Sequence, residues 1–455
     1  MRLSILGGGG FRTPLVYEAV ARRATGLTVD EVVLHDVDPQ RLRVMTDVIT
    51  GLARTIPDNR TAVRGTDSLE DAVTGADFIF CAIRVGGTHA RTVDERVALN
   101  LGLIGQETVG PGGLAYALRT IPEMDRIARI IAQQAPNSWV INFTNPAGIV
   151  TESMRRVLGN RVIGICDTPI GLVKRVARTL DLPQDQISYD YLGLNHLGWL
   201  RGLAVDGVDR LGDLLADDAL LEQIEEARLL GLDWVRQDGT LPNEYLYYYL
   251  HTDEAIRRIT AAAQTRGEFL VAQQGDFYRE ASCCSSPLKT WRDALQEREA
   301  TYMAESRDEE RREDDIAGGG YQEVALRLMT AIATGRPERM ILNVANDCAD
   351  QGLVAEGLPA DVVLEVPCVA DATGAHPLPV SAPSLGQLGL MARVRSAERC
   401  IATAALTGDR GAAWEGFSTH PLVDSPRLGA QLLDGYQAGH PELASLFGEG
   451  PGVAM

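Results

Sequence analysis

Short apolar segments alternate with longer helical patterns through the first two hundred residues. The predicted strands are residues 2–6, 31–35, 78–82, 138–142 and 161–165. The predicted helices lie between and after them, at residues 14–23, 39–53, 114–132, 146–158 and 169–180. Several of these helices carry proline in the first turn, where its missing N–H does no harm, and Pro122 is expected to interrupt the third helix. Alternation at this spacing predicts an α/β fold with a parallel, doubly wound, Rossmann-like sheet.

The regular alternation stops at about residue 187. Later strands are predicted at residues 187–194, 199–205, 339–343 and 362–366. Long helical stretches are predicted at residues 211–235, 242–272, 286–312, 321–333 and 386–407. The nearly all-charged segment 305–315 is expected to be a solvated helix end or loop. We therefore predict two domains, a Rossmann-like domain at residues 1–186 and a second, α+β domain at residues 187–455.

The chain is strongly acidic. Its 455 residues include 43 Lys and Arg against 62 Asp and Glu, which leaves a formal net charge of −19. Such a charge repels nucleic acid and anionic membranes at long range, and no apolar run approaches the roughly 20 residues that a bilayer-spanning helix needs. The first residues are predicted to form a strand that enters a glycine turn, and not a signal peptide. We expect a cytoplasmic protein with no nucleic-acid or membrane partner.

The cysteines do not form a recognisable framework. Seven of them are scattered along the chain, an odd number without any C-x-x-C pair. This pattern argues against structural disulfides, and we expect most of these residues to be buried thiols.

The first predicted strand opens into four glycines, Gly7, Gly8, Gly9 and Gly10, before a helix that starts near Thr13. A strand, a glycine turn and a helix N-terminus present backbone N–H groups to a pyrophosphate, which suggests a dinucleotide cofactor such as NAD. Asp36 follows the second strand and is placed to accept hydrogen bonds from a ribose. Arg12 stands where a third glycine is usual, and a plain glycine-rich turn is the alternative.

Cys166 and His196 are candidates for one divalent metal site. Cys166 follows a predicted strand, so it should lie at the carboxyl edge of the sheet, where open α/β folds bind ligands. His196 lies in a turn between two predicted strands. A buried thiol and a structurally bonded histidine are the alternative for this pair, and Asp167 is either a helix N-cap or an acid.

Several short motifs together resemble glycoside hydrolase family 4. They follow one another in the order found in that family, at residues 7–10, 84–87, 105–108, 142–146, 166–169 and 193–196. The resemblance extends to residues 321–323, 343–344 and 363–365, and it is weakest at about 211–320. It implies a fold like that of lactate and malate dehydrogenases, and a glycosidase that departs from the usual pair of carboxylates.

The resemblance implies a hydrolysis in which the sugar is transiently oxidised and then reduced again. In the family, NAD⁺ takes hydride from C3 of the sugar, which acidifies the proton at C2. A tyrosine removes that proton, a divalent metal held by the cysteine and histidine stabilises the developing charge, and the aglycone leaves by elimination. Water then adds at C1 and the hydride returns. The resemblance thus assigns Cys166 and His196 to a metal, with Mn²⁺ expected.

Other site residues follow from the same resemblance. Tyr245 resembles the family's catalytic base, although four tyrosines in five positions also fit an aromatic helix face, and the base could be Tyr247, Tyr248 or Tyr249. The residues that resemble substrate-binding positions are Arg84, Arg91, Glu107, Asn145 and Arg266. An arginine fork suits a phosphate dianion, but each arginine could equally form an ordinary salt bridge. Asn145 could be a turn residue before Pro146.

The substrate implied is a small 6-phosphoglycoside. In the family, asparagine after the metal-binding cysteine is common in 6-phospho-β-glucosidases, and aspartate there resembles the general acid of 6-phospho-α-glucosidases. The residue here is Asp167, whereas the 84–87 motif and the Asn195–Leu197 turn resemble the β-type enzymes, so we favour the β-glucosidase and keep the α-glucosidase open. Two other hypotheses are an NAD-dependent 2-hydroxy acid dehydrogenase and a non-catalytic NAD-sensing regulator. We expect a homodimer or homotetramer.

Overall fold

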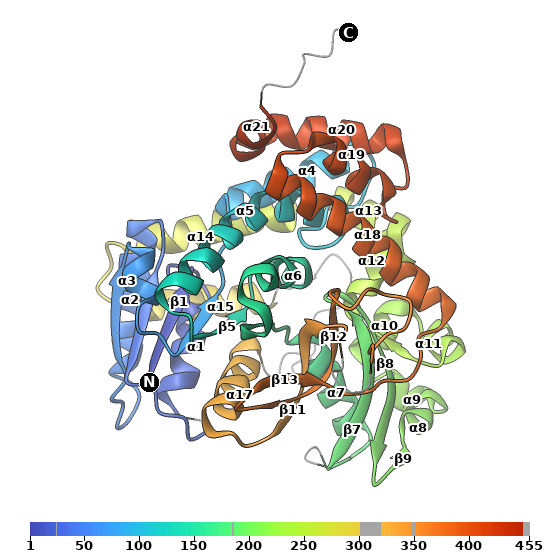
Figure 1. Cartoon of the computed structure of the whole chain (residues 1–455), viewed down its shortest axis with the longest axis horizontal. Coiled ribbons are helices and arrows are strands. Elements are labelled where there is room, and N and C mark those ends of the chain that lie inside the picture. The colour runs from blue at the N-terminus through green and yellow to red at the C-terminus, as the bar shows by residue number, and fades with distance from the viewer. Residues whose placement is uncertain (24, 184–185, 301–319, 348–351, 449–455) are drawn as a thin grey trace.

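A computed structural model of the chain describes residues 1–23, 25–183, 186–300, 320–347 and 352–448 (Figure 1). Among these residues, no helix combines the length and apolar character needed to cross a bilayer. Their strands form a single 13-stranded sheet with the order β10-β8-β7-β12-β11-β6-β5-β4-β1-β2-β3, to which β9 and β13 add at the side. The predicted α/β fold class, with a Rossmann-like sheet and an α+β second part, is confirmed.

The first six strands are parallel and carry the doubly wound part of the sheet. They are β1 (Arg2–Leu6), β2 (Glu31–His35), β3 (Ala62–Thr66), β4 (Phe78–Cys81), β5 (Trp139–Asn142) and β6 (Val162–Gly164). Chain order reverses at β1, which pairs with β2 on one side and β4 on the other. The carboxyl ends of β1 and β4 therefore open a crevice at the switch point, where folds of this kind bind ligands.

The helices of this part are α1 (Thr13–Ala21), α2 (Pro39–Ala53), α3 (Leu69–Val73), α4 (Gly87–Asn100), α5 (Gly110–Gln134), α6 (Ala147–Leu158) and α7 (Thr168–Thr179). The predicted interruption near Pro122 is wrong, because α5 runs through it without a break. Proline removes one helical hydrogen bond, but α5 is buried against α6 and α18, and this packing outweighs the loss. The sequence prediction also missed β3, α3 and α4.

The remaining strands are antiparallel to their neighbours. They are β7 (Ile187–Leu194), β8 (Leu197–Val205), β9 (Val208–Asp209), β10 (Leu241–Pro242), β11 (Glu338–Ala345), β12 (Val363–Asp371) and β13 (Gly374–Pro377). Strands β11 and β12 lie between β6 and β7, so late segments of the chain join the two early parts of the sheet. In this register Asn343 lies opposite both Gly164 and Glu365, and Glu365 lies opposite Gly193.

The long helices predicted at 211–235 and 242–272 are wrong. These stretches break into α8 (Leu211–Leu215), α9 (Asp218–Leu221), α10 (Glu225–Leu230), α11 (Leu232–Asp238), α12 (Tyr247–Leu250), α13 (Thr252–Ala261) and the start of α14 (Arg266–Ala281). Asp217 caps α9, and Gly231 and Gly239 stop helices with φ of +93° and +74°. After α15 (Pro287–Ala300), the rest of the predicted 286–312 helix and the charged segment 305–315 fall outside the described residues.

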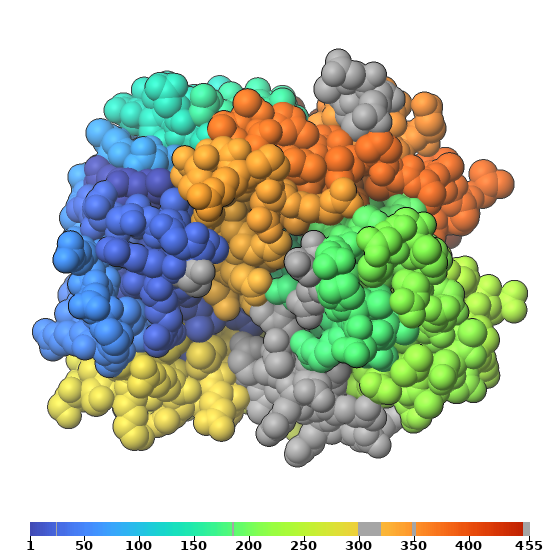
Figure 2. Space-filling model, turned by 90° about the horizontal axis from the view of Figure 1, so that it is seen from below, coloured from blue at the N-terminus to red at the C-terminus, as the bar shows by residue number. Residues whose placement is uncertain are grey.

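Helices from the second half of the chain cover the first half. Figure 2 shows α14 and α15 (yellow) against the N-terminal residues (blue), and these helices pack on α2 and α4. The last helices are α17 (Tyr321–Thr334), α18 (Leu385–Thr407), α19 (Arg410–Thr419), α20 (Pro426–Gly439) and α21 (Pro441–Phe447). Helices α18 to α21 lie across α4 and α5 (Figure 1).

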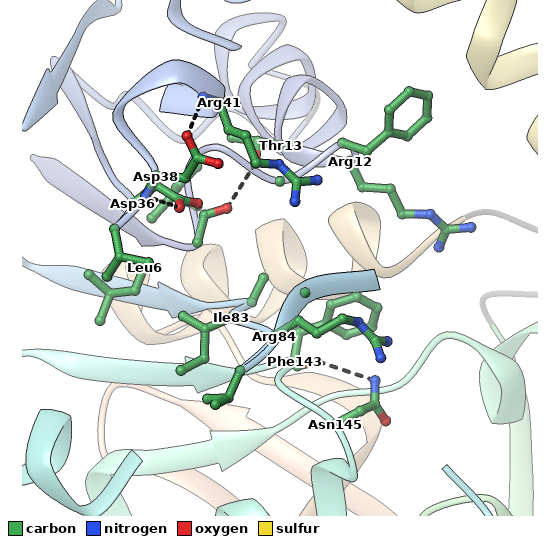
Figure 3. A pocket seen from close by; sticks show the side chains of 18 of the residues that line it. Leu6, Arg12, Thr13, Asp36, Asp38, Arg41, Ile83, Arg84, Phe143 and Asn145 are labelled. Carbon is green, nitrogen blue, oxygen red and sulfur yellow. Dashed lines mark hydrogen bonds between the residues drawn. The ribbon is translucent and has the colours of Figure 1, made fainter. Parts of the chain in front are cut away.

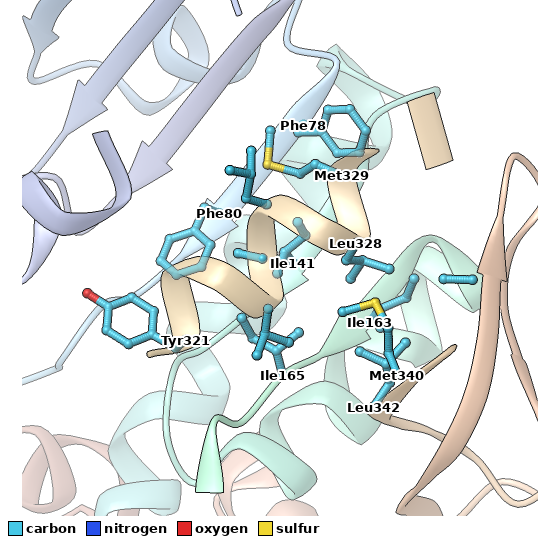
Figure 4. Packing of buried hydrophobic residues seen from close by; sticks show 14 of the residues in the cluster. Phe78, Phe80, Ile141, Ile163, Ile165, Tyr321, Leu328, Met329, Met340 and Leu342 are labelled. Atoms are coloured by element: carbon cyan, nitrogen blue, oxygen red, sulfur yellow. The ribbon is translucent and has the colours of Figure 1, made fainter. Parts of the chain in front are cut away.

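The main hydrophobic core joins early and late segments (Figure 4). Side chains of β4, β5 and β6 meet α17 and β11 there, among them Phe80, Ile141, Ile163, Leu328 and Met340. Each such large side chain contributes about 1.5–3 kcal/mol by its burial. The two parts of the chain therefore share one core, and the domain boundary at 186/187 stays a prediction.

Candidate active site

The glycine turn holds its backbone tightly against the sheet. The N–H groups of Gly7 and Gly8 donate to the carbonyl of His35 at 2.9 and 2.7 Å. Gly7 has a φ of +88°, and a Cβ there would lie 2.4 Å from the Ala82 oxygen. Because α1 starts at Thr13, the turn leads directly into a helix N-terminus, an arrangement suited to a pyrophosphate.

Asp36 organises the same turn. Its carboxylate accepts hydrogen bonds from the N–H groups of Gly9 at 2.9 Å and Asp38 at 3.0 Å. A Cβ on Gly9 would lie 2.8 Å from the Asp36 carboxylate, so a side chain at this position would displace that carboxylate. Each carboxylate oxygen keeps a further lone pair, with which Asp36 can also accept from a ligand hydroxyl.

A cavity of about 780 Å³ runs from this turn to the residues after β4 and β5. In Figure 3, Asp36, Asp38 and Arg41 gather at one end of the cavity, and the side chains of Arg84 and Asn145 lie at the other. Of the predicted site residues, those that line it are Gly7, Gly10, Asp36, Arg84, Arg91 and Asn145. A pocket of this size is typical for a small ligand or a cofactor.

Arg84 and Arg91 share one carboxylate. Glu107 lies 2.5 Å from a nitrogen of Arg84 and 2.7 Å from one of Arg91, and Arg91 also pairs with Glu95 at 2.7 Å. Burial opposes the ionisation of Glu107, but the two arginines outweigh it and lower its pKa to about 2. Arg84 and Arg91 therefore form salt bridges and also line the cavity, whereas Glu107 is not part of the described lining.

The side-chain oxygen of Asn145 is buried and accepts no hydrogen bond from the described residues. The Nδ2 of the same side chain donates to the Phe143 carbonyl at 3.4 Å. A buried amide oxygen without a partner costs about 1–3 kcal/mol, which a ligand hydroxyl would recover. Asn145 is thus suited to bind a sugar hydroxyl in the cavity.

His196 and Tyr245 stack face to face, with ring centroids 3.8 Å apart and planes 10° from parallel. Nδ1 of His196 lies 3.0 Å from the Thr108 hydroxyl, and burial lowers the pKa of the imidazole to about 4. His196 is therefore neutral near pH 7, the form that ligates metals. Neither ring is part of the lining described for the large cavity.

The other three tyrosines of this segment have different surroundings. Tyr247 packs edge-on against Tyr248 at 5.7 Å and stacks on His251 at 5.5 Å, and both tyrosines are buried. Tyr249 lies tilted against His420 at 6.2 Å. The aromatic packing expected for part of this segment is present, and Tyr245 is the tyrosine that contacts His196.

Cys166 lies two residues beyond β6, at the carboxyl edge of the parallel strands. Its thiol donates to the Thr168 hydroxyl at 3.7 Å. Burial and the nearby carboxyls of Glu365 and Asp167 raise the pKa of this thiol. Asp167 occupies the N-cap position of α7, but its side chain makes no capping hydrogen bond there. The described residues contain no cluster of three or more His, Cys, Asp or Glu that could hold a metal.

Arg266 begins α14 and is not part of the lining described for the cavity, but it contacts a residue that is. One of its nitrogens donates to the carbonyl of Arg298 at 3.0 Å, and Arg298 lines the cavity. The sequence carried no signal for Arg298, since it lies in a charged run. Arg12 and Arg41 also line the cavity without having been predicted as site residues, although Arg12 directly follows the glycine turn.

The cysteine prediction is only partly right. All six described cysteines are free, as expected. Cys81, Cys166 and Cys368 are buried, but Cys283 is exposed, Cys284 and Cys400 are partly exposed, and Cys348 lies outside the described residues. Half of the described thiols are thus buried, and not most of them, because Cys283 and Cys284 follow the end of α14, where the chain is not fully covered.

Two family models cover most of the chain. Residues 2–182 match the family 4 glycosyl hydrolase model, and residues 191–423 match the family 4 glycosyl hydrolase C-terminal domain. The protein named "Probable 6-phospho-beta-glucosidase" of Bacillus subtilis is 30% identical over 95% of each chain.

Solved structures agree with these matches. A 6-phospho-beta-glucosidase from Thermotoga maritima, with NAD and glucose-6-phosphate, has a TM-score of 0.82 and 25% identity, covering 97% of this chain and 99% of its own. A 6-phospho-alpha-glucosidase from gut microorganisms, with NAD and Mn²⁺, has a TM-score of 0.77 and 25% identity, covering 96% and 97%. The chain therefore belongs to family 4 of the glycosyl hydrolases.

Proposed function

We propose that the chain is an NAD- and divalent-metal-dependent 6-phosphoglucosidase that favours 6-phospho-β-glucosides. The observation that carries this proposal is the single cavity of about 780 Å³ that joins the glycine turn and Asp36 to Arg84, Arg91 and Asn145. Such a space suits a dinucleotide and a phosphorylated sugar side by side. The similar proteins described with NAD, Mn²⁺ or glucose-6-phosphate support it.

The glycine turn fits NAD. A Cβ on Gly7, Gly8 or Gly9 would come within 3 Å of neighbouring protein atoms, so the turn can pack this closely on the sheet only without side chains. We assign the pyrophosphate to this turn and a ribose hydroxyl to Asp36. When bound, the cofactor would supply a reversible hydride acceptor, and the metal would supply positive charge beside the sugar hydroxyls.

We assign a divalent metal such as Mn²⁺ to Cys166 and His196, whose sulfur and imidazole nitrogen are both donors that such ions accept. His196 offers a neutral imidazole, with Nδ1 at 3.0 Å from Thr108 and Nε2 left for a ligand bond. Burial disfavours the thiolate of Cys166, a cost that a bound cation would offset. Since the described residues offer no third such donor, we assign the remaining positions to substrate and water oxygens.

Tyr245 is our candidate for the base that removes the proton from C2 of the sugar. Its ring stacks on that of His196, the residue to which we assign the metal. A nearby cation lowers the pKa of a phenol and favours the phenolate that the reaction needs. Asn145 would hold a sugar hydroxyl with its buried oxygen.

We assign the 6-phosphate to the cationic end of the cavity. Arg84 and Arg91 lie there, held apart from each other by the shared carboxylate of Glu107. Their ion pairs fix both side chains before a substrate arrives, which lowers the entropy cost of binding. Arg266 would contribute indirectly, because its hydrogen bond holds the backbone of Arg298, which lines the cavity.

A 6-phospho-α-glucosidase is the second candidate, and Asp167 favours it. Its carboxyl does not cap α7, so it remains available as a general acid for the leaving group. The similarity to a 6-phospho-alpha-glucosidase structure also supports this candidate. Membership of a hydrolase family does not favour the hydroxy acid dehydrogenase.

The decisive experiment compares p-nitrophenyl 6-phosphoglucosides of both anomers, with and without NAD⁺, Mn²⁺ and a reductant. We expect turnover that needs both additions, is faster for the β-anomer and leaves no net NADH. Faster cleavage of the α-anomer would reverse the anomeric assignment. Absence of turnover, together with net NADH from a hydroxy acid, would refute the glycosidase.

The variant Asp167→Asn tests the general acid separately. If Asp167 protonates the leaving group, the variant should cleave an activated p-nitrophenyl substrate almost normally but lose about 10²-fold on an alkyl glycoside. Equal losses on both substrates would assign Asp167 to another role.

A further inference from the structure

Glu365 is a buried carboxyl that the proposed reaction does not use. It lies in β12 with only 1% of its surface exposed. Its Oε1 accepts hydrogen bonds from the side-chain amides of Asn195 at 3.1 Å and Asn343 at 3.0 Å, and its Oε2 accepts from the Tyr191 hydroxyl at 3.3 Å. Buried charged groups are costly, so a carboxyl in the middle of a sheet calls for an explanation.

One branch of this hydrogen-bond network leads to His196. Asn195 directly precedes His196 in the tight turn between β7 and β8, where His196 has a φ of +63°. A left-handed backbone is unfavourable for a residue with a side chain, so it persists only where neighbouring contacts hold it. The bond from Asn195 to Glu365 ties this turn to β12.

The other branch leads to Tyr245. The Tyr191 hydroxyl, which donates to Glu365, accepts from the Nδ2 of Asn243 at 3.4 Å. The Oδ1 of Asn243 in turn accepts from the backbone N–H of Tyr245 at 3.0 Å, which caps the turn that carries this residue. A Cβ at Gly198 would lie 2.3 Å from the Tyr191 hydroxyl, so this branch also requires glycine at that position.

We propose that Glu365 is a positioning residue that fixes His196 and Tyr245 relative to each other through these two branches. The inference rests on the proposed function, in which His196 holds the metal and Tyr245 is the base. One branch ends at the residue before His196 and the other at the backbone N–H of Tyr245. The rings of His196 and Tyr245 stack, and the branches leave the carboxyl from different oxygens. A carboxylate suits this task because both its oxygens accept, whereas an amide has one accepting oxygen.

The two branches should fail separately. Tyr191→Phe removes the hydroxyl that reaches Asn243, so we expect C2 proton exchange to slow about 10-fold while the Kd for Mn²⁺ changes less than about 2-fold. Asn195→Ala cuts the branch to His196, and it should weaken Mn²⁺ binding about 10-fold, with exchange largely restored at saturating Mn²⁺. Asn343→Leu is the matched control, since Asn343 contacts the same carboxyl but leads to neither ring.

Glu365→Gln gives the sharpest test. Its amide oxygen can still accept from Asn195 and Asn343, but its NH₂ cannot accept from Tyr191. The variant should therefore resemble Tyr191→Phe and not Asn195→Ala. An Mn²⁺ affinity lowered as much as in Asn195→Ala, or equal effects of the two branch variants on both measurements, would overturn the proposal.

A measurement without cofactor or metal separates this proposal from the proposed function. With ¹⁵N-histidine labelling, the chain has seven imidazoles to resolve. In the apo protein, Asn195→Ala should shift the His196 signal, whereas Asn343→Leu should not. Unshifted His196 in Asn195→Ala would refute the positioning role even if hydrolysis is found. Inactive wild-type protein with the expected shift would refute only the glycosidase.

Discussion

The two ends of the cavity are built in different ways. At the nucleotide end, the lining comes mainly from one β-α-β unit, where Leu6 and His35 are paired neighbours in the sheet. At the sugar end it comes from side chains that distant segments supply, such as Arg84 after β4 and Asn145 after β5. The hydrogen bonds of the sheet and the glycine turn fix the nucleotide end, whereas each side chain at the sugar end needs a partner to hold it.

The difference shows in how charge is handled. Asp36 receives two backbone N–H groups and needs no cation. Arg84 and Arg91 are held by Glu107 and Glu95, so removal of one member leaves another buried charge without its partner. We therefore expect substitutions among the proposed catalytic and sugar-binding residues to be more damaging than those at the nucleotide end, and the following variants test this expectation in order of decreasing effect.

The largest loss should follow from removing the proposed metal ligands. Cys166→Ser and His196→Ala should each lower kcat/KM by at least about 10³-fold, because a metal contributes several kcal/mol of charge stabilisation. NAD⁺ binding, followed by calorimetry, should stay within about 3-fold, since neither residue lines the cavity. Undiminished hydrolysis in either variant would remove that residue from the metal site.

Loss of the proposed base comes next. Tyr245→Phe should slow solvent deuterium incorporation at C2 on the order of 10²-fold, the typical contribution of general base catalysis. Tyr247→Phe is the matched control, because Tyr247 packs against Tyr248 and His251 and not against His196. If Tyr247→Phe shows the larger loss, the base is misassigned.

A smaller effect is expected from the phosphate-binding arginines. Arg84→Gln should raise the KM for a 6-phosphoglucoside about 10–100-fold, which corresponds to one charge-assisted hydrogen bond, with kcat less affected. Arg129→Gln, which breaks an exposed pair with Asp125 on α5, serves as the control. An unchanged KM for the phosphorylated substrate in steady-state kinetics would move the phosphate elsewhere.

The nucleotide end should respond in NAD⁺ affinity alone. Gly9→Ala would bring a Cβ within 2.8 Å of the Asp36 carboxylate and so displace it. We expect the Kd for NAD⁺ to rise about 10-fold, with KM for the sugar unchanged at saturating NAD⁺. An equal rise in the Kd for NAD⁺ and in the KM for the sugar would mean that the nucleotide end and the sugar end of the cavity are not independent.

The weakest effect concerns acid stability. Since the pKa of Glu107 is lowered from 4.5 to about 2 in the folded protein, its ion pairs stabilise the fold above pH 4.5 and lose this contribution as the pH falls toward 2. Glu107→Gln should flatten the dependence of Tm on pH in that window, as measured by calorimetry. An unaltered slope would show that Arg84 and Arg91 do not hold Glu107 ionised.

The parallel half of the fold was largely readable from the sequence. Strand β2 and helix α2 have the predicted bounds, because each is a simple apolar or amphipathic segment with clear ends. Helix α4 was missed because it buries charged residues, Arg91, Asp94 and Glu95 among them, and so lacks an apolar stripe. Edge strand β3 was missed for a related reason, since none of its five residues is buried.

The candidate site divides in the same way. The glycine turn and Asp36 are local signals, and the structure brings them together at one edge of the sheet. Tyr245 and His196 are far apart in the chain. His196 was a candidate metal ligand and Tyr245 came from the family resemblance, but no sequence signal predicted the contact between their rings. Glu365 had a weaker signal, an acidic residue within an apolar strand, but its partners lie at positions that no local pattern connects.

The position of β11 and β12 has a consequence for synthesis on the ribosome. Both strands lie between β6 and β7, yet they are made long after either of them, since β12 ends at Asp371 whereas β7 ends at Leu194. At about 5–20 residues per second, translation leaves a gap of roughly 10–35 s. During that time the nascent chain presents the unpaired edges of β6 and β7, which are templates for wrong pairing. Chaperone dependence of the yield should therefore arise at this seam.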